Sequence, residues 1–118
     1  MRSTDQLGEW GEDVAVQHLR AAGFAILDRN WRCRDGELDV VAREGDALVF
    51  VEVKTRSGRR FGSPAEAVSA AKVRKLRLLA ARWLAGHPGG GADLRFDVIG
   101  ILREPGASPH VTHLRGAF

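Results

Sequence analysis

The chain has 118 residues, enough for one domain with a modest core and too few for two. Its composition, 44% hydrophobic and 28% charged, is that of an ordinary globular protein, and its apolar stretches are too short to span a membrane. A single cysteine, Cys33, excludes an internal disulfide and a cysteine-based metal cluster. The amino terminus also lacks the apolar core of a secretory signal, so we expect a cytoplasmic location.

The first predicted element is an amphipathic helix over about residues 4–22, with Gly23 as its stop signal. Glu12 is unusual in this helix because it falls at the edge of the apolar arc. An acid at that position would be drawn toward the core rather than into solvent. Gly8 and Gly11 would allow another segment to approach the helix closely.

Three strands are predicted to follow, at residues 24–31, 37–42 and 48–54. In the second strand, Asp39 lies among aliphatic residues. The third strand is an apolar run that ends in Glu52-Val53-Lys54. Because side chains alternate along a strand, Glu52 and Lys54 share one face, about 7 Å apart. A metal or a phosphate could lie beside both charges.

A second helix is predicted to end near Ala85, and both Ser63 and Ser69 could cap its start. Lys72 falls within its apolar stripe, so this side chain must extend to water or meet an anion. A glycine-rich stretch follows, and further strands are predicted at residues 94–102 and 111–114. We expect a structural role for Asp97 in the first of these strands, and surface positions rather than a metal site for His110 and His113.

Basic side chains follow the Glu-x-Lys pair and continue along the second helix, although the net charge is only +3. Basic groups around an acidic centre suit a phosphate backbone held over bound cations. The alternative interpretation is a solvated helix face beside a loop. The side chains expected to contact nucleic acid are Arg56, Arg59, Arg60, Lys72 and Lys75.

Several motifs together resemble the YraN-like family of small bacterial proteins: Gly8-Glu9-Trp10-Gly11-Glu12, Gly36-Glu37-Leu38-Asp39, Glu52-Val53-Lys54-Thr55-Arg56 and Arg95-Phe96-Asp97. That family is regarded as related to the archaeal Holliday-junction resolvases within the PD-(D/E)xK nuclease superfamily. The resemblance implies a single nuclease-like domain over residues 1–118. Its fold class would be α/β, with a restriction-endonuclease-like core of helix, three strands, helix and strand, in which helices flank a mixed sheet. One departure is that Glu37-Leu38 replaces the proline that precedes the aspartate in the superfamily.

The same resemblance assigns catalytic roles to Glu12, Asp39, Glu52 and Lys54. Glu12, Asp39 and Glu52 would be the metal ligands, and carboxylate oxygens suit Mg²⁺ or Mn²⁺. Lys54 would either orient or deprotonate the attacking water, or stabilise charge on the phosphoryl group, and the sequence does not decide between these roles. Glu37 lies on the same predicted strand face as Asp39, which fits a further ligand and a solvent-facing rim equally well.

Two functions follow from these features. The first is a metal-dependent endonuclease that hydrolyses phosphodiester bonds of DNA, with branched DNA in recombination or repair as its substrate. The second is a non-catalytic nucleic-acid-binding module that retains the nuclease fold. The acids favour the first function, because a pure binder gains nothing from carboxylates that face phosphate. The resemblance also implies a homodimer, but the sequence identifies no dimer surface and leaves a monomer open.

Overall fold

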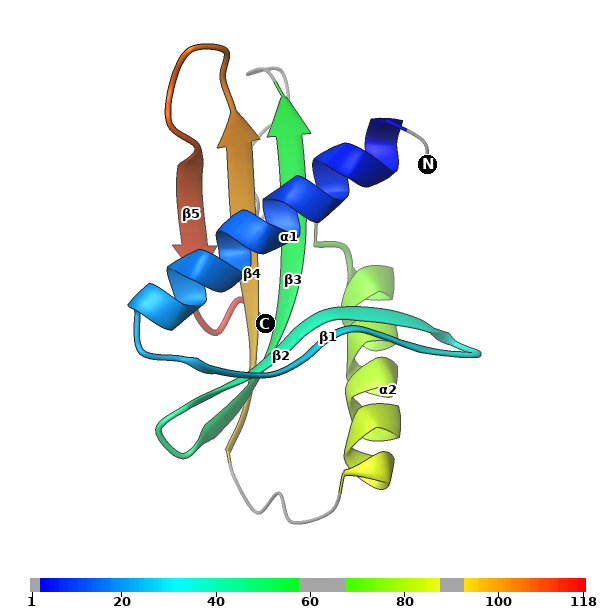
Figure 1. Cartoon of the computed structure of the whole chain (residues 1–118). Coiled ribbons are helices and arrows are strands. Elements are labelled where there is room, and N and C mark those ends of the chain that lie inside the picture. Colours follow the sequence, from blue (N-terminus) through cyan, green and yellow to red (C-terminus); the bar gives the residue numbers. More distant parts are fainter. Residues whose placement is uncertain (1–2, 58–67, 88–92) are drawn as a thin grey trace.

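The computed structural model describes residues 3–57, 68–87 and 93–118. Its elements, in chain order, are α1 (Ser3–Ala21), β1 (Ala25–Cys33), β2 (Gly36–Glu44), β3 (Ala47–Ser57), α2 (Ala70–Gly86), β4 (Asp93–Arg103) and β5 (His110–Leu114). Every helix and strand predicted from the sequence has its counterpart in this order (Figure 1). The predicted α/β class is therefore confirmed.

The strands form one five-stranded sheet in the order β1-β2-β3-β4-β5. β1 pairs antiparallel with β2 and β2 antiparallel with β3, whereas β4 runs parallel to β3 and β5 returns antiparallel to β4. The parallel pair requires a crossover connection, and α2 lies in that connection. The sheet is therefore mixed, as predicted.

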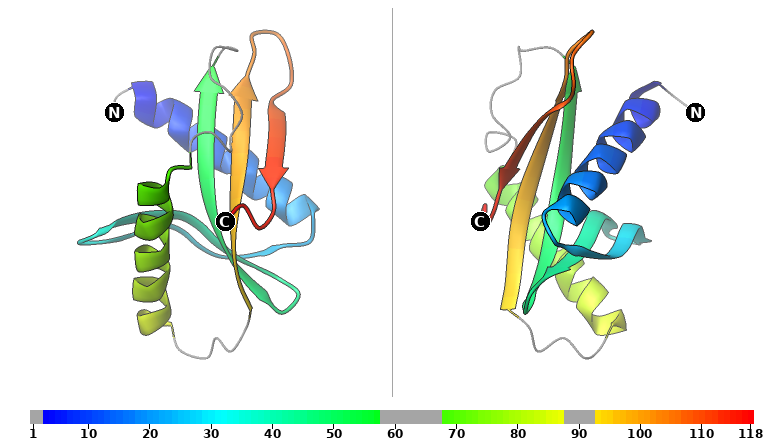
Figure 2. Two further views of the ribbon diagram at one scale, coloured as in Figure 1. Left: turned by 180° about the vertical axis from the view of Figure 1, so that it is seen from behind. Right: turned by 60° about the vertical axis from the view of Figure 1, so that its left-hand side comes forward.

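The two helices cover opposite faces of the sheet, as the alternation along β3 shows. Val49 and Val51 pack in a core cluster with α1, whereas Leu48 and Phe50 pack in a second cluster with α2. Figure 2 shows the same arrangement, with α1 behind the sheet when α2 is in front. The expected mixed sheet flanked by helices is present, and β3 contributes side chains to the core on each of its two faces.

The start of α2 agrees with one of the two predicted caps. Ser69 is the N-cap residue, and its Oγ accepts a hydrogen bond from the backbone N–H of Lys72 at 3.1 Å. The other predicted cap, Ser63, lies outside the described residues, as do Arg59 and Arg60. Within the residues that the structure covers, no helix is long and apolar enough to cross a membrane.

Candidate active site

The candidate site begins where β2 separates from β3. The ladder between these strands runs from Glu44 and Ala47 to Val40 and Val51, and Asp39 is the next residue of β2. Instead of continuing the backbone ladder, Asp39 accepts a hydrogen bond at Oδ2 from the backbone N–H of Val53, at 2.9 Å. The carboxyl group thus satisfies a backbone donor at the fork between the two strands.

The hairpin of β1 and β2 kinks at this fork. Val41 and Leu38 both pack in the cluster with α2, although they are three positions apart and a regular strand would place them on opposite faces. On the neighbouring strand, Asn30 has a φ of 52°, in the left-handed region that asparagine tolerates better than most residues. Pairing resumes beyond the kink, where Trp31 is opposite Leu38. The kink therefore redirects the hairpin toward α2 and leaves Asp39 at the bend (Figure 1).

Glu12 reaches the fork because α1 approaches β3 closely at the preceding residue. A Cβ atom on Gly11 would lie 1.8 Å from Oγ1 of Thr55, so no larger residue fits without movement of the helix. A Cβ atom on Gly8, in contrast, would have no neighbour within 4 Å. The close approach expected from the sequence is therefore correct for Gly11 and wrong for Gly8.

Three acids converge at the fork. Carboxylate oxygens of Glu12, Glu37 and Asp39 all lie within 4.8 Å of one another, and each of these side chains is half-buried. Glu37 also forms an ion pair with Arg32, with Oε2 and Nε 2.8 Å apart. Glu37 lies beside Asp39 and Glu12 with 31% of its side chain exposed, so its two expected roles, a further ligand and a solvent-facing rim, stay predictions. We call Glu12, Glu37, Asp39 and the adjacent Glu52 the acidic centre.

Glu52 lies deeper than the other acids, with a relative exposure of 7%. Its carboxyl group shares a hydrogen bond with Asp39. Its Oε2 atom forms an ion pair with Nζ of Lys72 at 2.7 Å and has no other partner within the described residues. A buried carboxylate oxygen with unused acceptor capacity is the kind of atom that a cation coordinates.

The acids of this centre do not share one protonation state. Burial, together with the hydrogen bond and the charge of Glu52, raises the pKa of Asp39 to about 9. Burial also favours the neutral form of Glu52, but the hydrogen bond from Asp39 and the nearby Lys72 and Lys54 ammonium groups outweigh it and lower the pKa of Glu52. In the absence of a cation, Asp39 therefore holds a proton that it donates to Glu52.

A divalent cation suits this centre. Its donors are carboxylate oxygens, the ligands that Mg²⁺ and Mn²⁺ prefer, and Glu52 supplies an oxygen with unused acceptor capacity. Burial raises the pKa of Glu12 despite a hydrogen bond from Asn30, so this acid also gains from a nearby positive charge. The residues predicted as ligands are thus neighbours in space, and Glu37 is added to them.

The predicted basic residues lie in different parts of the structure. Lys54 and Arg56 continue β3 beyond Glu52 and are half-buried. Of the two alternatives expected for Lys72, extension to water or contact with an anion, the structure shows an anion, which is Glu52. Lys75 is exposed one turn further along α2. Arg59 and Arg60 belong to the segment outside the described ranges, so their predicted contacts stay predictions.

Asn30, which holds Glu12 by a side-chain hydrogen bond at the kink, was not among the predicted site residues. Its position in the sequence is inside a predicted strand, where this residue type is disfavoured. An asparagine there fits a position with positive φ.

Asp97 belongs to a separate buried network. Its side chain is fully buried and accepts hydrogen bonds from Arg95 at 2.8 and 2.9 Å and from the backbone N–H of Gly116 at 3.0 Å. Nε2 of His113 lies 2.8 Å from the same carboxylate, and Nδ1 of this ring lies 3.1 Å from His18. His113 has only 8% of its side chain exposed, so the expected surface position is wrong for His113 and correct for His110. The contacts of Asp97 agree with the structural role expected for it.

Comparison with known proteins gives one family. The model of Uncharacterised protein family UPF0102 matches residues 11–101. A UPF0102 protein of Frankia alni is 61% identical over 118 residues, which are 100% of this chain and 98% of that protein. Another, of Beutenbergia cavernae, is 53% identical over 116 residues, or 98% of each chain. Among solved structures, Hjc, a Holliday junction resolvase of Archaeoglobus fulgidus, matches 88% of this chain and 74% of its own, with a TM-score of 0.49 and 23% identity.

Proposed function

The chain belongs to the UPF0102 family, which confirms the YraN-like resemblance of its motifs, and we propose that it is a divalent-metal-dependent nuclease acting on DNA. The observation that carries this proposal is the acidic centre. Carboxylates of Glu12, Glu37 and Asp39 converge within 4.8 Å beside the buried Glu52. Such a concentration of acids is unfavourable unless protons or a cation offset it.

The charges around the centre support a phosphate substrate. Lys54 follows Glu52 on β3, and Lys72 and Lys75 lie on successive turns of α2. A phosphodiester would therefore be attracted by the surrounding ammonium groups, while the acids at the fork hold the cation. A binding surface for phosphate alone has no use for the buried Glu52.

Each side chain of the centre has a proposed task. Asp39 and Glu52 would hold a Mg²⁺ or Mn²⁺ ion, with Glu12 and Glu37 on the open side. When bound, the cation supplies a concentrated positive charge that stabilises the phosphoryl oxygens during hydrolysis. Lys54 would donate hydrogen bonds to the phosphoryl oxygens or to the attacking water. Asn30 would keep Glu12 oriented.

The finer features of this function come from the family resemblance. Branched DNA is the proposed substrate class, endonucleolytic cleavage the proposed reaction and a homodimer the proposed assembly. We also propose that the chain acts as a single nuclease-like domain in the cytoplasm. Each of these features can be tested separately from the presence of a metal-dependent site.

The decisive experiment is cleavage of labelled four-way junction, flap, single-stranded and duplex DNA in Mg²⁺, Mn²⁺ or EDTA. Glu52→Gln and Asp39→Asn should each lower the cleavage rate by at least about 100-fold. Mutation of a residue that only hydrogen-bonds to a metal ligand already lowers metal affinity or activity by about 10- to 100-fold. Glu9→Gln is the matched control, because Glu9 is an exposed acid one turn before Glu12 on α1. Its cleavage should equal that of the wild type.

The alternative function, a non-catalytic nucleic-acid-binding module, has one specific observation in its favour. Burial and Glu52 raise the pKa of Asp39 to about 9, and Lys72 pairs with Glu52, so a proton and an ammonium group offset the charges of these two acids without a cation. DNA binding without cleavage under every metal condition would support this alternative. Cleavage that persists in both acid variants would indicate a contaminating nuclease.

A further inference from the structure

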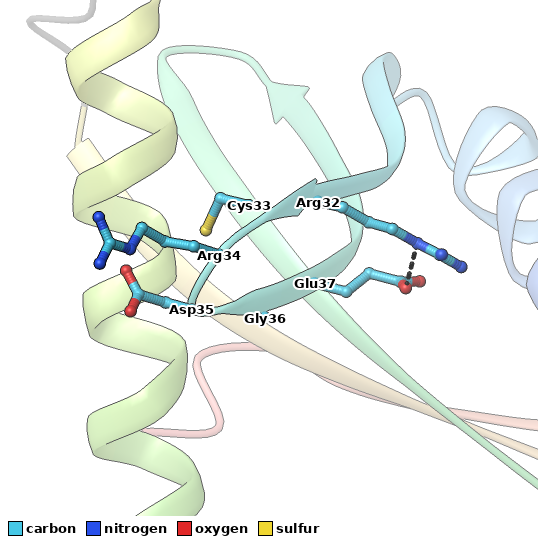
Figure 3. Close-up of a pocket in the computed structure, with 6 residues that line it drawn as sticks. All are labelled: Arg32, Cys33, Arg34, Asp35, Gly36 and Glu37. Carbon is cyan, nitrogen blue, oxygen red and sulfur yellow. Dashed lines mark ion pairs between the residues drawn. The ribbon is translucent and has the colours of Figure 1, made fainter.

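The tip of the β1–β2 hairpin carries basic residues that the acidic centre does not use. Figure 3 shows Arg34 and Asp35 beside α2, whereas Arg32 and Glu37 extend along the hairpin in the other direction. These residues, with Cys33 and Gly36, line a hollow of about 420 Å³. Arg34 is exposed and forms no ion pair within the part of the chain that the structure describes.

The tip packs against a helix that is itself basic. A Cβ on Gly36 would lie 3.1 Å from Cε of Lys75 and 3.4 Å from Cδ1 of Leu79, so the turn rests on these side chains. Arg82, two turns along α2, pairs with Asp35 at 3.0 Å. The 17 residues of α2 include no acid, and among the described residues the ion-pair partners of its basic side chains are Asp35 on the hairpin and Glu52 on β3. We call Arg34, Lys75 and Arg82 the tip surface.

Two short paths connect the tip surface to the acidic centre. Along the hairpin, Glu37 belongs to the centre and pairs with Arg32 at 2.8 Å. Along α2, Lys72 pairs with Glu52 in the centre and lies one turn before Lys75. From Lys72 to Arg82 the helix rises by about 15 Å, an axial length over which one DNA strand presents about four phosphates.

We propose that the tip surface binds the phosphate backbone of the DNA strand that leaves the acidic centre, with Arg34 and Lys75 as its principal contacts. This inference rests on the proposed function and adds a binding surface to it. Arg34 and Lys75 are suited to this role because both are exposed and neither has an ion pair among the described residues. Contacts of this kind position the substrate and read no sequence.

The test is DNA binding in EDTA, where cleavage plays no part. Fluorescence anisotropy with a labelled four-way junction, repeated at several salt concentrations, gives the dissociation constant and its salt dependence. The double variant R34A/K75A should bind about 10-fold more weakly at moderate salt, and the slope of log affinity against log salt should fall by about 2, or about 1 for each lost phosphate contact. The matched control is R20A, which removes an exposed arginine from the last turn of α1, at the opposite end of the molecule from the tip.

The outcomes separate this inference from the proposed function. Weaker binding with a smaller slope supports the tip surface, whether or not the wild type cleaves DNA. An unchanged affinity and slope in a folded double variant, with cleavage that still depends on Glu52, would overturn the inference and leave the nuclease intact. Altered sedimentation of the double variant without DNA would also overturn it, because the tip would then be an interface between copies of the chain.

In the nuclease assay, the double variant should raise KM by about 10-fold and leave kcat unchanged.

Discussion

Lys72 on α2 and Glu52 on β3 form an ion pair, with Nζ and Oε2 2.7 Å apart, where the basic helix meets the acidic centre. The two side chains differ in burial, since 36% of Lys72 but only 8% of Glu52 is exposed. Lys72 thus neutralises a buried carboxylate that a cation would otherwise use. An ammonium group and a metal ion compete for the same carboxylate oxygen, because each binds to the lone pairs of that oxygen.

Lys72→Met should therefore bind Mn²⁺ more tightly than the wild type, by about fivefold, because a positive charge beside the cation is removed. The same variant should bind DNA more weakly, since it also loses a phosphate contact. Calorimetric titration with Mn²⁺ and anisotropy in EDTA measure these two opposite effects. Lys75→Met is the control for metal affinity, because Lys75 lies on the next turn of the same helix. Weaker Mn²⁺ binding in Lys72→Met would show that the ammonium supports the site instead of competing with the cation.

Asp39→Asn should separate folding from metal binding. An asparagine side chain can accept the hydrogen bond from Val53 N–H and donate to Glu52, as the protonated Asp39 does. The free energy of unfolding in EDTA should thus stay within about 0.5 kcal/mol of the wild type. Mn²⁺ should stabilise the wild type and not the variant, because ligand binding to the folded state adds to stability. Urea unfolding with and without Mn²⁺ makes this comparison, and a variant already unstable in EDTA would contradict the shared proton.

Local pattern was sufficient to predict the elements of the fold. Short apolar segments bounded by turn residues identified the strands, and Ser69 was one of the two predicted caps for α2. Local pattern also predicted that Glu12 faces the sheet and that Asp39 and Glu52 lie in apolar strands, whereas their grouping into one site came from the family resemblance. Their catalytic and metal-binding roles stay predictions.

The kink and the pairings across elements were not predictable in the same way. Asn30 adopts a positive φ inside β1. Asparagine is also common in turns, so this residue alone did not predict a kink within a strand. The partner of Lys72 depends on how α2 lies on the sheet, and the burial of His113 depends on contacts with His18 and Asp97, which lie far from it in the sequence. Such interactions follow from tertiary packing, which sequence periodicity does not specify.

Gly11→Ala should destabilise the protein and disturb the acidic centre. Its Cβ would collide with Thr55, so α1 must move away from β3 and take Glu12 with it. We expect a loss of about 1–3 kcal/mol in the free energy of unfolding, together with weaker Mn²⁺ binding. Gly8→Ala is the control, because its Cβ meets nothing within 4 Å, and it should raise stability by up to about 1 kcal/mol through helix propensity.

Adding Thr55→Ala to Gly11→Ala should restore part of the loss, since it removes the side chain with which the new Cβ collides. Thermal or urea unfolding of the four proteins in this cycle gives the coupling energy. Independent, additive effects of the two substitutions would contradict the close contact between α1 and β3.

Asp97→Asn should lower the free energy of unfolding without changing metal affinity, because the Asp97 network is separate from the acidic centre. Burial alone would raise the pKa of Asp97, but hydrogen bonds from Arg95, Gly116 and His113 outweigh it and lower the pKa. A carboxyl group whose pKa is lower in the folded state stabilises the protein at pH values above its unfolded pKa of 3.8. This contribution is lost as the pH falls through the folded pKa. The loss in the variant at pH 7 should be about 2–4 kcal/mol, because Arg95 is left without its buried anion.

The same substitution should also flatten the acid limb of the stability curve. Urea unfolding between pH 7 and pH 3 should show the wild type losing the contribution of Asp97 as the pH falls, whereas Asp97→Asn has no such contribution to lose. Asp93→Asn is the matched control, because Asp93 is an exposed aspartate at the start of the same strand, and its curve should follow the wild type. An Asp97→Asn protein as stable as the wild type at pH 7 would mean that the buried carboxylate contributes no net stability. In that case the hydrogen bonds from Arg95, Gly116 and His113 would do no more than offset the free energy of burying its charge.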